Sequence, residues 1–185
     1  VYPIHEAWKD IGHLDEYNNV NNIWVNIIFE KKIIMNKIDQ IFKKSININE
    51  FSKSYFDYLG QVLSNISLDE IESFVNLILG AREREATIFF IGNGGSAATA
   101  SHFANDIAIG TRTYEKPFRV ISLCDNQAVI TAIANDDGYE KIFSQQLKVL
   151  LKKQDVVVAI SASGNSPNLI DAINTAKKMN AISVG

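Results

Sequence analysis

The second half of the chain alternates between two kinds of hydrophobic pattern. Four short strand-like runs occur, of which those at 87–91 and 156–160 are apolar and rich in β-branched and aromatic residues, typical of strands buried on both faces of a parallel sheet. The four runs lie at 87–91, 119–123, 156–160 and 181–184. Between them, apolar residues recur every three or four positions, which predicts helices at about 96–109, 126–134, 139–152 and 168–179. The alternation predicts an α/β fold with a doubly wound parallel sheet flanked by helices.

The region at 36–84 has the helical period alone. One apolar stripe consists of Phe51, Tyr55, Tyr58, Leu59, Val62 and Leu63. A second stripe follows Ser67 and Glu70, whose spacing is that of a capping box at the start of a helix. We therefore expect two or three N-terminal helices whose stripes are packing surfaces, and such leading helices often serve subunit association.

The two ends of the chain differ from this pattern. Residues 1–34 are rich in Asn, Trp and Tyr and have no sustained period, so we expect an extension outside the main fold, with Met35 as the natural start of a separate polypeptide. We expect one domain at 35–185, with helices at 36–84 and an α/β core at 87–185. Because the sequence ends at Gly185 directly after a strand, we expect the core to be incomplete and the sequence to be a fragment.

Composition narrows the functional classes. A net charge of −3 and a pI near 5.6 supply no basic field for nucleic acid. No stretch approaches the roughly 18 apolar residues of a membrane span, and the N-terminus lacks the order of a secretory signal. The single cysteine, Cys124, fits a reducing compartment, so we expect a cytoplasmic protein with neither a nucleic-acid nor a membrane partner.

Two turns carry the most informative residues. Each follows a predicted strand and precedes a predicted helix, at 92–96 (Gly-Asn-Gly-Gly-Ser) and at 161–166 (Ser-Ala-Ser-Gly-Asn-Ser). Glycines allow close approach of a ligand to the backbone, hydroxyls donate hydrogen bonds, and the free N–H groups of a helix start attract an anion. Neither turn contains Lys or Arg, unlike a Walker loop. The pattern predicts a site for a phosphorylated small molecule at the carboxyl ends of the strands.

Two further pairs are candidates on weaker grounds. His102 and Asp106 are four positions apart on a predicted helix, so their side chains point the same way and can share a metal ion or a hydrogen bond. The alternative is an ordinary surface histidine. Asn135 and Asp136 either approach the ligand or form a turn with Asp137 and Gly138.

Four motifs in order resemble one known family. Gly-Asn-Gly-Gly-Ser at 92–96, His-Phe-Ala at 102–104, Asn-Asp at 135–136 and Ser-x-Ser-Gly-Asn-Ser at 161–166 resemble the sugar isomerase (SIS) domain, and within it the phosphoheptose isomerases, over about 35–185. The resemblance implies the SIS form of the flavodoxin-like sheet, a homotetramer and a sugar-phosphate ligand. It implies that the ligand is lined by Asn93, Gly94, Gly95, Ser96, Asn135, Asp136, Ser161, Ala162, Ser163 and Ser166. Ala162 stands where many members carry threonine.

The same resemblance implies a reaction. It is the isomerisation of sedoheptulose 7-phosphate to D-glycero-D-manno-heptose 7-phosphate through an enediol, in heptose biosynthesis for surface polysaccharides such as lipopolysaccharide or capsule. Asp106 is the implied catalytic base, and His102 with Asp106 is the implied half of a Zn²⁺ site. Asp106 replaces the family's glutamate and is one methylene shorter. The family's partner histidine on a later helix is absent from this sequence, whose histidines are His5, His13 and His102.

Two other functions stay open. A non-catalytic SIS protein would bind a sugar phosphate or the bacterial replication initiator, and 129–136 resembles the initiator-binding type. That class lacks a carboxylate at position 106, which this chain retains. A regulatory sugar-phosphate sensor would normally carry a DNA-binding domain, and no such domain is visible in the sequence.

The extension has a resemblance of its own. Trp-Lys-Asp-Ile-Gly at 8–12 resembles the closing segment of sugar nucleotidyltransferases, in which the residue corresponding to Asp10 helps to hold Mg²⁺. The nucleotide-binding portion of such an enzyme is absent here, so we expect Asp10 to be idle. The alternative is a partly ordered amphipathic extension.

Overall fold

The computed structural model describes residues 36–185. The expectations for 1–34, including the nucleotidyltransferase-like signature and Asp10, lie outside the described residues. The chain divides near residue 67 into two compact units, and each is described by itself.

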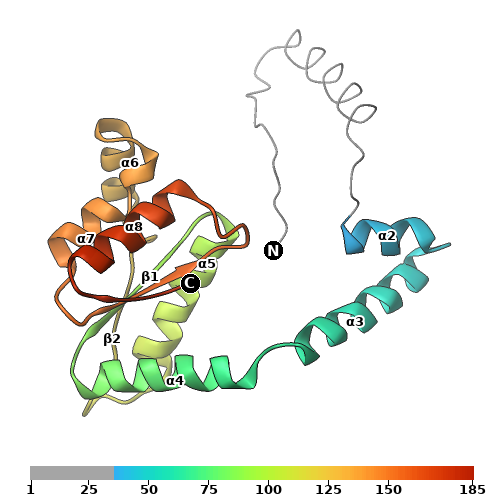
Figure 1. The fold of residues 1–185 in the computed structure, drawn as a ribbon, viewed down its shortest axis with the longest axis horizontal. Helices are drawn as coiled ribbons and strands as arrows, with labels where there is room; N and C mark the ends of the chain where they lie inside the picture. Colours follow the sequence, from blue (N-terminus) through green and yellow to red (C-terminus); the bar gives the residue numbers. More distant parts are fainter. Residues whose placement is uncertain (1–35) are drawn as a thin grey trace, which may run out of the picture. The chain divides into compact units, whose positions relative to one another are not determined.

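The unit at 68–185 alternates helices and strands in the predicted order (Figure 1). Its elements are α4 (Leu68–Glu83), β1 (Thr87–Gly92), α5 (Gly95–Asn105), the π-helix η1 (Asp106–Gly110), β2 (Arg119–Ser122), α6 (Gln127–Asp136), the 3-10 helix η2 (Tyr139–Lys141), α7 (Ser144–Leu150), β3 (Val156–Ile160), α8 (Pro167–Lys178) and β4 (Ile182–Val184). All four predicted strands are therefore present.

The four strands form one parallel sheet in the order β2-β1-β3-β4. The chain moves from β1 outward to β2, and then returns to place β3 on the other side of β1. This reversal makes the sheet doubly wound, as the sequence predicts, and puts the topological switch point between β1 and β3. In register, Gly92 at the end of β1 lies opposite Ile160 at the end of β3, so the two predicted turns begin side by side.

Each face of the sheet has its own core. Phe89, Ile91 and Val157 pack on one face, together with α7 and α8 residues such as Leu147 and Ala172. Alternate strand residues form the opposite face with α4 and α5: Ile88, Phe90, Val156 and Val158 pack against Ile78, Ala81, Ala100 and Ala104. Figure 1 shows the two pairs of helices on either side of the strands. Burial on both faces explains why β1 and β3 are apolar at successive positions.

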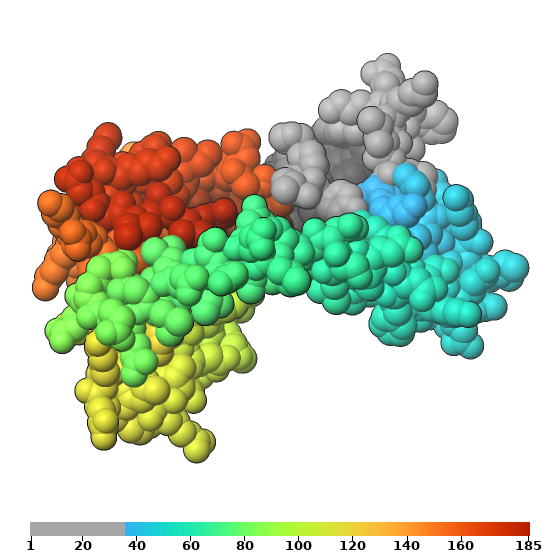
Figure 2. All heavy atoms as spheres, turned by 60° about the horizontal axis from the view of Figure 1, so that its bottom comes forward, coloured from blue at the N-terminus to red at the C-terminus, as the bar shows by residue number. Residues whose placement is uncertain are grey.

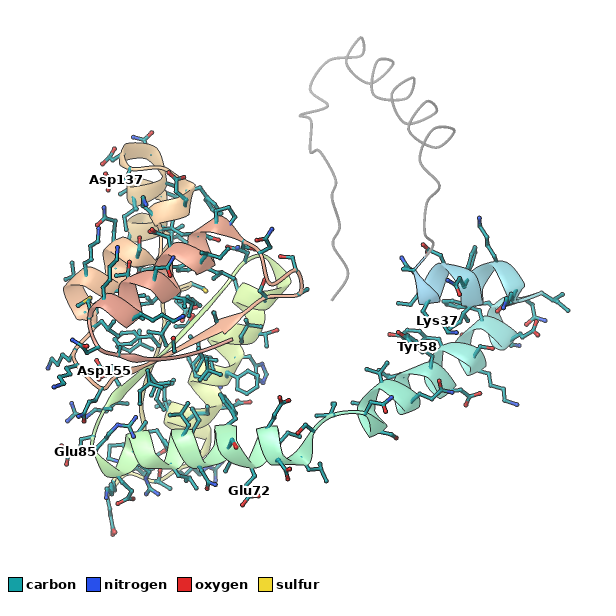
Figure 3. The ribbon with its side chains drawn as sticks, viewed as in Figure 1. Lys37, Tyr58, Glu72, Glu85, Asp137 and Asp155 are labelled. Carbon is teal, nitrogen blue, oxygen red and sulfur yellow. The ribbon has the colours of Figure 1, made fainter. Side chains whose placement is uncertain are left out.

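The amino ends of β1 and β3 are joined by one buried carboxylate. Asp155, labelled in Figure 3, accepts hydrogen bonds from the backbone N–H of Thr87 at 2.8 Å and from that of Lys152 at 2.7 Å. A buried carboxylate needs such donors because it has lost its water. Asp155 thus fastens the central strand pair at the end opposite the two turns.

Two predicted helices differ from the structure. The helix expected at 96–109 is α5 up to Asn105, and continues as the π-helix η1. The helix expected at 139–152 is the 3-10 turn η2 followed by the shorter α7. Both segments are helical as predicted and differ in helix type, because an apolar stripe with a period near 3.6 does not distinguish hydrogen bonds to the fourth residue from those to the third or fifth.

The unit before residue 68 contains, within the described residues, α2 (Lys37–Lys44) and α3 (Ile48–Ser64). The side chains of Asn36 and Asn47 cap the two helices by accepting from the backbone N–H groups of Asp39 and Glu50. The rings of Phe42 and Phe51 meet edge to face at 5.5 Å. No described residue of α2 or α3 is buried, and the apolar stripe of α3 leaves Leu59, Val62 and Leu63 exposed. Figure 2 draws the atoms of α2 and α3 in blue to teal.

Within 36–185, no helix combines the length and the apolar character needed to cross a membrane.

Candidate functional site

The two turns leave adjacent strands at the switch point of the sheet. The first leads from β1 into α5, and the second leads from β3 into α8. Because α5 and α8 cover opposite faces of the sheet, the start of each helix borders the crevice at the carboxyl ends of the strands. The structure therefore brings together 93–96 and 161–166, as the sequence predicts.

The first turn has its shape set by the backbone. A Cβ on Gly92 would lie 2.6 Å from the carbonyl oxygen of Ser96, so only glycine fits there. Gly94 has a φ of +52°, a conformation that favours glycine. The carbonyl of Asn93 accepts the backbone N–H of Ser96 at 2.9 Å. A Cβ on Gly94 or Gly95 would meet nothing within 4 Å, so the turn presents its backbone to open space.

The second turn has its shape set by hydroxyl groups. Ser161 Oγ accepts the backbone N–H of Gly164 at 3.0 Å, and Ser163 Oγ accepts that of Asn165 at 3.3 Å. Ser163 Oγ also lies 3.4 Å from Ser161 Oγ and 3.5 Å from Ser166 Oγ. Ala162 is exposed between them. The three predicted hydroxyls therefore converge, and those of Ser161 and Ser163 accept the backbone N–H groups of Gly164 and Asn165.

Open space adjoins the second turn. A hollow of about 570 Å³ is lined by Ser161, Gly164, Ile160, Leu169 and Ile173, among others. Its wall is polar at the turn, largely apolar along β3, and mixed along α8, where Asn174 and Lys177 join the apolar residues, and Gly185, the last residue of the sequence, also lines it.

Sequence reasoning missed the contact that joins the two turns. The side-chain amides of Asn93 and Asn168 exchange hydrogen bonds at 2.9 and 2.7 Å. Tyr139 donates its hydroxyl hydrogen to Asn93 Oδ1 at 3.2 Å. From sequence, Asn168 stands where a helix begins and could cap that helix and contact the ligand at once, and Tyr139 gave no signal. The sequence signal for this contact was the polar residue Asn168 directly before the apolar Leu169 near the start of α8.

The segment that carries Tyr139 is fixed to α8. Lys141 in η2 pairs with Asp171 on α8 at 3.2 Å. The pKa of Asp171 lies below its ordinary value, because Ser144 donates a hydrogen bond to the carboxylate and Lys141 pairs with it. The same segment follows Asn135 and Asp136, which end α6 and bond to each other at 2.8 Å. Asp137, labelled in Figure 3, comes next and accepts from Gln145, so the turn and ligand interpretations of this pair both stay open.

Cys124 lies behind the first turn. Its thiol donates to the carbonyl of Gly92 at 3.4 Å, and its own N–H donates to Ser122 Oγ at 3.1 Å. Burial raises the pKa of the Cys124 thiol, so the neutral form dominates at neutral pH. Cys124 therefore supports the turn and is no activated nucleophile.

His102 and Asp106 lie on the same side of their helix, as their spacing predicts. His102 Nε2 is 2.9 Å from Asp106 Oδ2, and the two side chains are 76% and 58% exposed. Zinc sites in proteins have three or four protein ligands. No group of three or more His, Cys, Asp and Glu side chains at 36–185 is arranged to hold a metal. The pair thus has suitable chemistry for zinc but is short of a complete ligand set.

Comparison with known proteins places these features in a family. Residues 54–185 match the model of the SIS domain. A probable phosphoheptose isomerase of Thermoplasma acidophilum is 38% identical over 128 residues, which are 69% of this chain and 70% of that protein. The phosphoheptose isomerase of Helicobacter pylori strain P12 is 40% identical over 114 residues, 61% of this chain and 59% of the relative. The chain thus spans between about six and seven tenths of these relatives.

Two solved structures of phosphoheptose isomerases are similar to this chain. The phosphoheptose isomerase of Neisseria gonorrhoeae superposes with a TM-score of 0.66 at 31% identity, covering 74% of this chain and 73% of that one. A phosphoheptose isomerase of Francisella tularensis gives 0.67 at 25% identity, covering 80% and 74%. With this sheet order, the two turns at its switch point and these matches, the chain belongs to the SIS domain family and, within it, to the phosphoheptose isomerases.

Proposed function

We propose that this chain takes part in the isomerisation of sedoheptulose 7-phosphate to D-glycero-D-manno-heptose 7-phosphate. The observation that carries the proposal is the meeting of a glycine turn and a hydroxyl turn at the β1/β3 switch point, each opening a helix. Two helix starts and several neutral donors suit a phosphate group better than a neutral sugar. The free thiol of Cys124 fits a reducing cytoplasm, and we include that location in the proposal.

Phosphate binding would exchange partners within the second turn. The N–H groups of Gly164 and Asn165 now donate to Ser161 and Ser163. A phosphate oxygen is a stronger acceptor than a hydroxyl because it is charged. On binding, those N–H groups would turn to phosphate, and the freed hydroxyls would donate to it as well.

The isomerisation itself needs two proton shifts, one from C1 to C2 and one from O1 to O2. Asp106, as the base, would take a proton from C1 of the ketose while O2 gains a proton, which gives the enediol. Return of a proton to C2 and loss of the O1 proton give the aldose, so the reaction is balanced without an oxidant. The His102 hydrogen bond would orient the Asp106 carboxylate for this task.

The position of Asp106 points to a site shared between copies of the chain. Asp106 follows the 11 residues of α5, which begin at the first turn. At about 1.5 Å per residue, its backbone lies about 16 Å along the helix from that turn, so one heptose phosphate would have to be fully extended to join the two. We propose that the base instead serves a site on a neighbouring copy. The exposed apolar stripes of α2 and α3 supply a surface for such assembly, and we propose a homotetramer.

Zinc is a further part of the proposal, with His102 and Asp106 as two of its ligands. Because the described residues supply only this pair, no step above is assigned to the metal. Titration with Zn²⁺, read by calorimetry on the parent and on His102→Ala, tests it. Equal heats from the two proteins would contradict zinc binding here.

Calorimetry tests the ligand. We expect sedoheptulose 7-phosphate to bind, sedoheptulose to bind far more weakly, and Ser163→Ala to lose roughly tenfold or more in affinity, since a hydrogen bond to a charged group contributes about 1.5–3 kcal/mol. Ser73→Ala on α4, an exposed serine, is the matched control. Equal affinity for the two sugars would contradict a phosphate site.

Mixing two variants tests the shared site. Asp106→Asn removes the base, so this protein alone should be nearly inactive, and Ser163→Ala weakens phosphate binding, so this protein alone should lose most of its turnover at substrate concentrations well below its Kd. Mixed assemblies would contain some sites with both groups intact, and we expect part of the isomerase activity to return. If turnover by Asp106→Asn alone equals that of the parent, Asp106 is not the base.

One other function has support. A non-catalytic SIS protein would use the same two turns to bind a sugar phosphate, and the segment at 129–136 resembles the type that binds the replication initiator. Asp106 favours the enzyme. Tight binding of the sugar phosphate with no turnover by the parent assembly would favour the binder.

A further inference from the structure

We propose that Asn168 and Tyr139 are positioning residues that act through Asn93 to hold the glycine turn and the serine turn at one separation, and thereby set the affinity for the ligand. The ligand, a sugar phosphate, is that of the proposed function, and the positioning role rests on the hydrogen bonds among Asn93, Asn168 and Tyr139. Neither residue is among those that the sequence motifs assign to the ligand.

The contact between Asn93 and Asn168 is reciprocal. Asn93 Nδ2 donates to Asn168 Oδ1 at 2.9 Å, and Asn168 Nδ2 donates to Asn93 Oδ1 at 2.7 Å. Each amide thus offers its donor and its acceptor to the same partner, which fixes the orientation of both groups. Asn168 is 2% exposed, so water cannot replace this partner cheaply if it is lost.

Two further bonds tie the pair to its surroundings. Tyr139 donates to Asn93 Oδ1 at 3.2 Å, and Asn168 Oδ1 accepts the backbone N–H of Leu169 at 3.0 Å. The pair therefore connects the first turn, η2 and the first turn of α8. These segments lie up to 75 positions apart in the sequence.

Asn93 is the centre of this arrangement. Its carbonyl oxygen accepts the N–H of Ser96, and so sets the start of α5, while its side chain reaches the start of α8. Movement of Asn168 would be passed to the backbone of Gly94 and Gly95, which faces open space. Because a phosphate held by both turns needs its donors at fixed positions, a shift of the pair should weaken binding even in a folded protein.

A double-mutant cycle tests the pair. Asn93→Ala, Asn168→Ala and the double variant are compared by calorimetry with sedoheptulose 7-phosphate. We expect each single variant to bind about tenfold more weakly, and the double variant to be little worse than either single one, since both changes break the same unit. Asn76→Ala, which removes an exposed asparagine from α4, should bind like the parent.

Tyr139→Phe removes one hydrogen bond and leaves the ring. We expect a smaller loss of affinity, about threefold, and none for Tyr114→Phe, in which the phenol is exposed. Thermal unfolding on every variant separates the roles, because a residue that only stabilises the fold would lower the melting temperature without changing the affinity of the folded protein.

Hydrogen exchange supplies a readout that needs no ligand. In Asn168→Ala, the amides of Gly94, Gly95 and Ser96 should exchange faster, while those of β1 and β3 keep their protection. Affinity of folded Asn168→Ala within twofold of the parent, fully additive losses in the cycle, or unchanged exchange at 94–96 would each overturn the inference. If the parent does not bind the sugar phosphate, the proposed function fails, and the exchange result alone decides the positioning role.

Discussion

The two turns at the switch point reach similar positions by different means. In the turn after β1, the chain is held by backbone constraints: Gly92 has no room for a side chain, and Gly94 has a positive φ. In the turn after β3, the chain is held by side chains, since Ser161 and Ser163 accept the N–H groups of the loop itself.

The difference implies a division of labour. A turn shaped by sterics keeps its donors in place whether or not a ligand is present. A turn shaped by hydroxyls can release its internal bonds to a ligand of the right charge. Substitutions that add a side chain at Gly92 or Gly94 should therefore act mainly on stability, and substitutions of the hydroxyls in the second turn mainly on affinity.

The largest effect is expected for Gly92→Ala. The added methyl group would lie 2.6 Å from a backbone oxygen, so the turn or the start of α5 must shift. We expect a loss of about 2–3 kcal/mol in the free energy of unfolding, or roughly 5–10 °C in Tm, measured by thermal denaturation.

Gly95→Ala is the matched control for this prediction. Its methyl group would meet nothing within 4 Å, and alanine is a better helix former than glycine. Its Tm should equal or exceed that of the parent, although the methyl group faces the proposed ligand. Equal Tm losses in the two variants would contradict the steric explanation of the first turn.

An intermediate effect is expected for Ser161→Ala. The change frees the N–H of Gly164 without adding bulk, so Tm should move by less than about 2 °C. Affinity for sedoheptulose 7-phosphate should fall about tenfold, because one donor to the phosphate is lost. A large Tm loss with unchanged affinity would show that this turn, too, serves stability.

The smallest effect is expected for Ser166→Ala. Ser166 stands at the N-cap of α8, but its side chain makes no capping hydrogen bond. A capping serine contributes about 1 kcal/mol, so its replacement here should cost less than about 0.5 kcal/mol by urea denaturation. A full capping loss would mean that Ser166 caps the helix in solution.

The sheet was predictable because strands that are buried on both faces are apolar at successive positions. Positions such as 88–91 and 156–158 are apolar in succession since both faces are covered, and the turn residues directly after them mark the switch point. The strand order β2-β1-β3-β4 is not given by local pattern, because the crossover rule fixes only the hand of each connection. The site's main features were nevertheless available from local pattern.

The contacts that organise the site were not predictable in this way. Asn93 meets Asn168 and Tyr139 only after the chain has folded, and single polar residues have no period. The π-helix at Asp106 leaves the apolar stripe unchanged. The apolar stripe of α3 predicts packing, yet no residue of α3 is buried. A stripe indicates that a helix has an apolar face, but it does not identify the surface that covers this face.

The buried carboxylate of Asp155 and the amide pair of Asn93 and Asn168 lie at opposite ends of the same two strands. The carboxylate of Asp155 hydrogen-bonds at the amino ends of β1 and β3. The amides of Asn93 and Asn168 hydrogen-bond beyond the carboxyl ends of the same strands, so side-chain contacts hold the pair of strands at both ends. A one-residue shift of either strand would break the hydrogen bonds at both ends and turn its side chains to the wrong face of the sheet. The separation of the two turns is thereby fixed by side-chain hydrogen bonds at both ends of the strands.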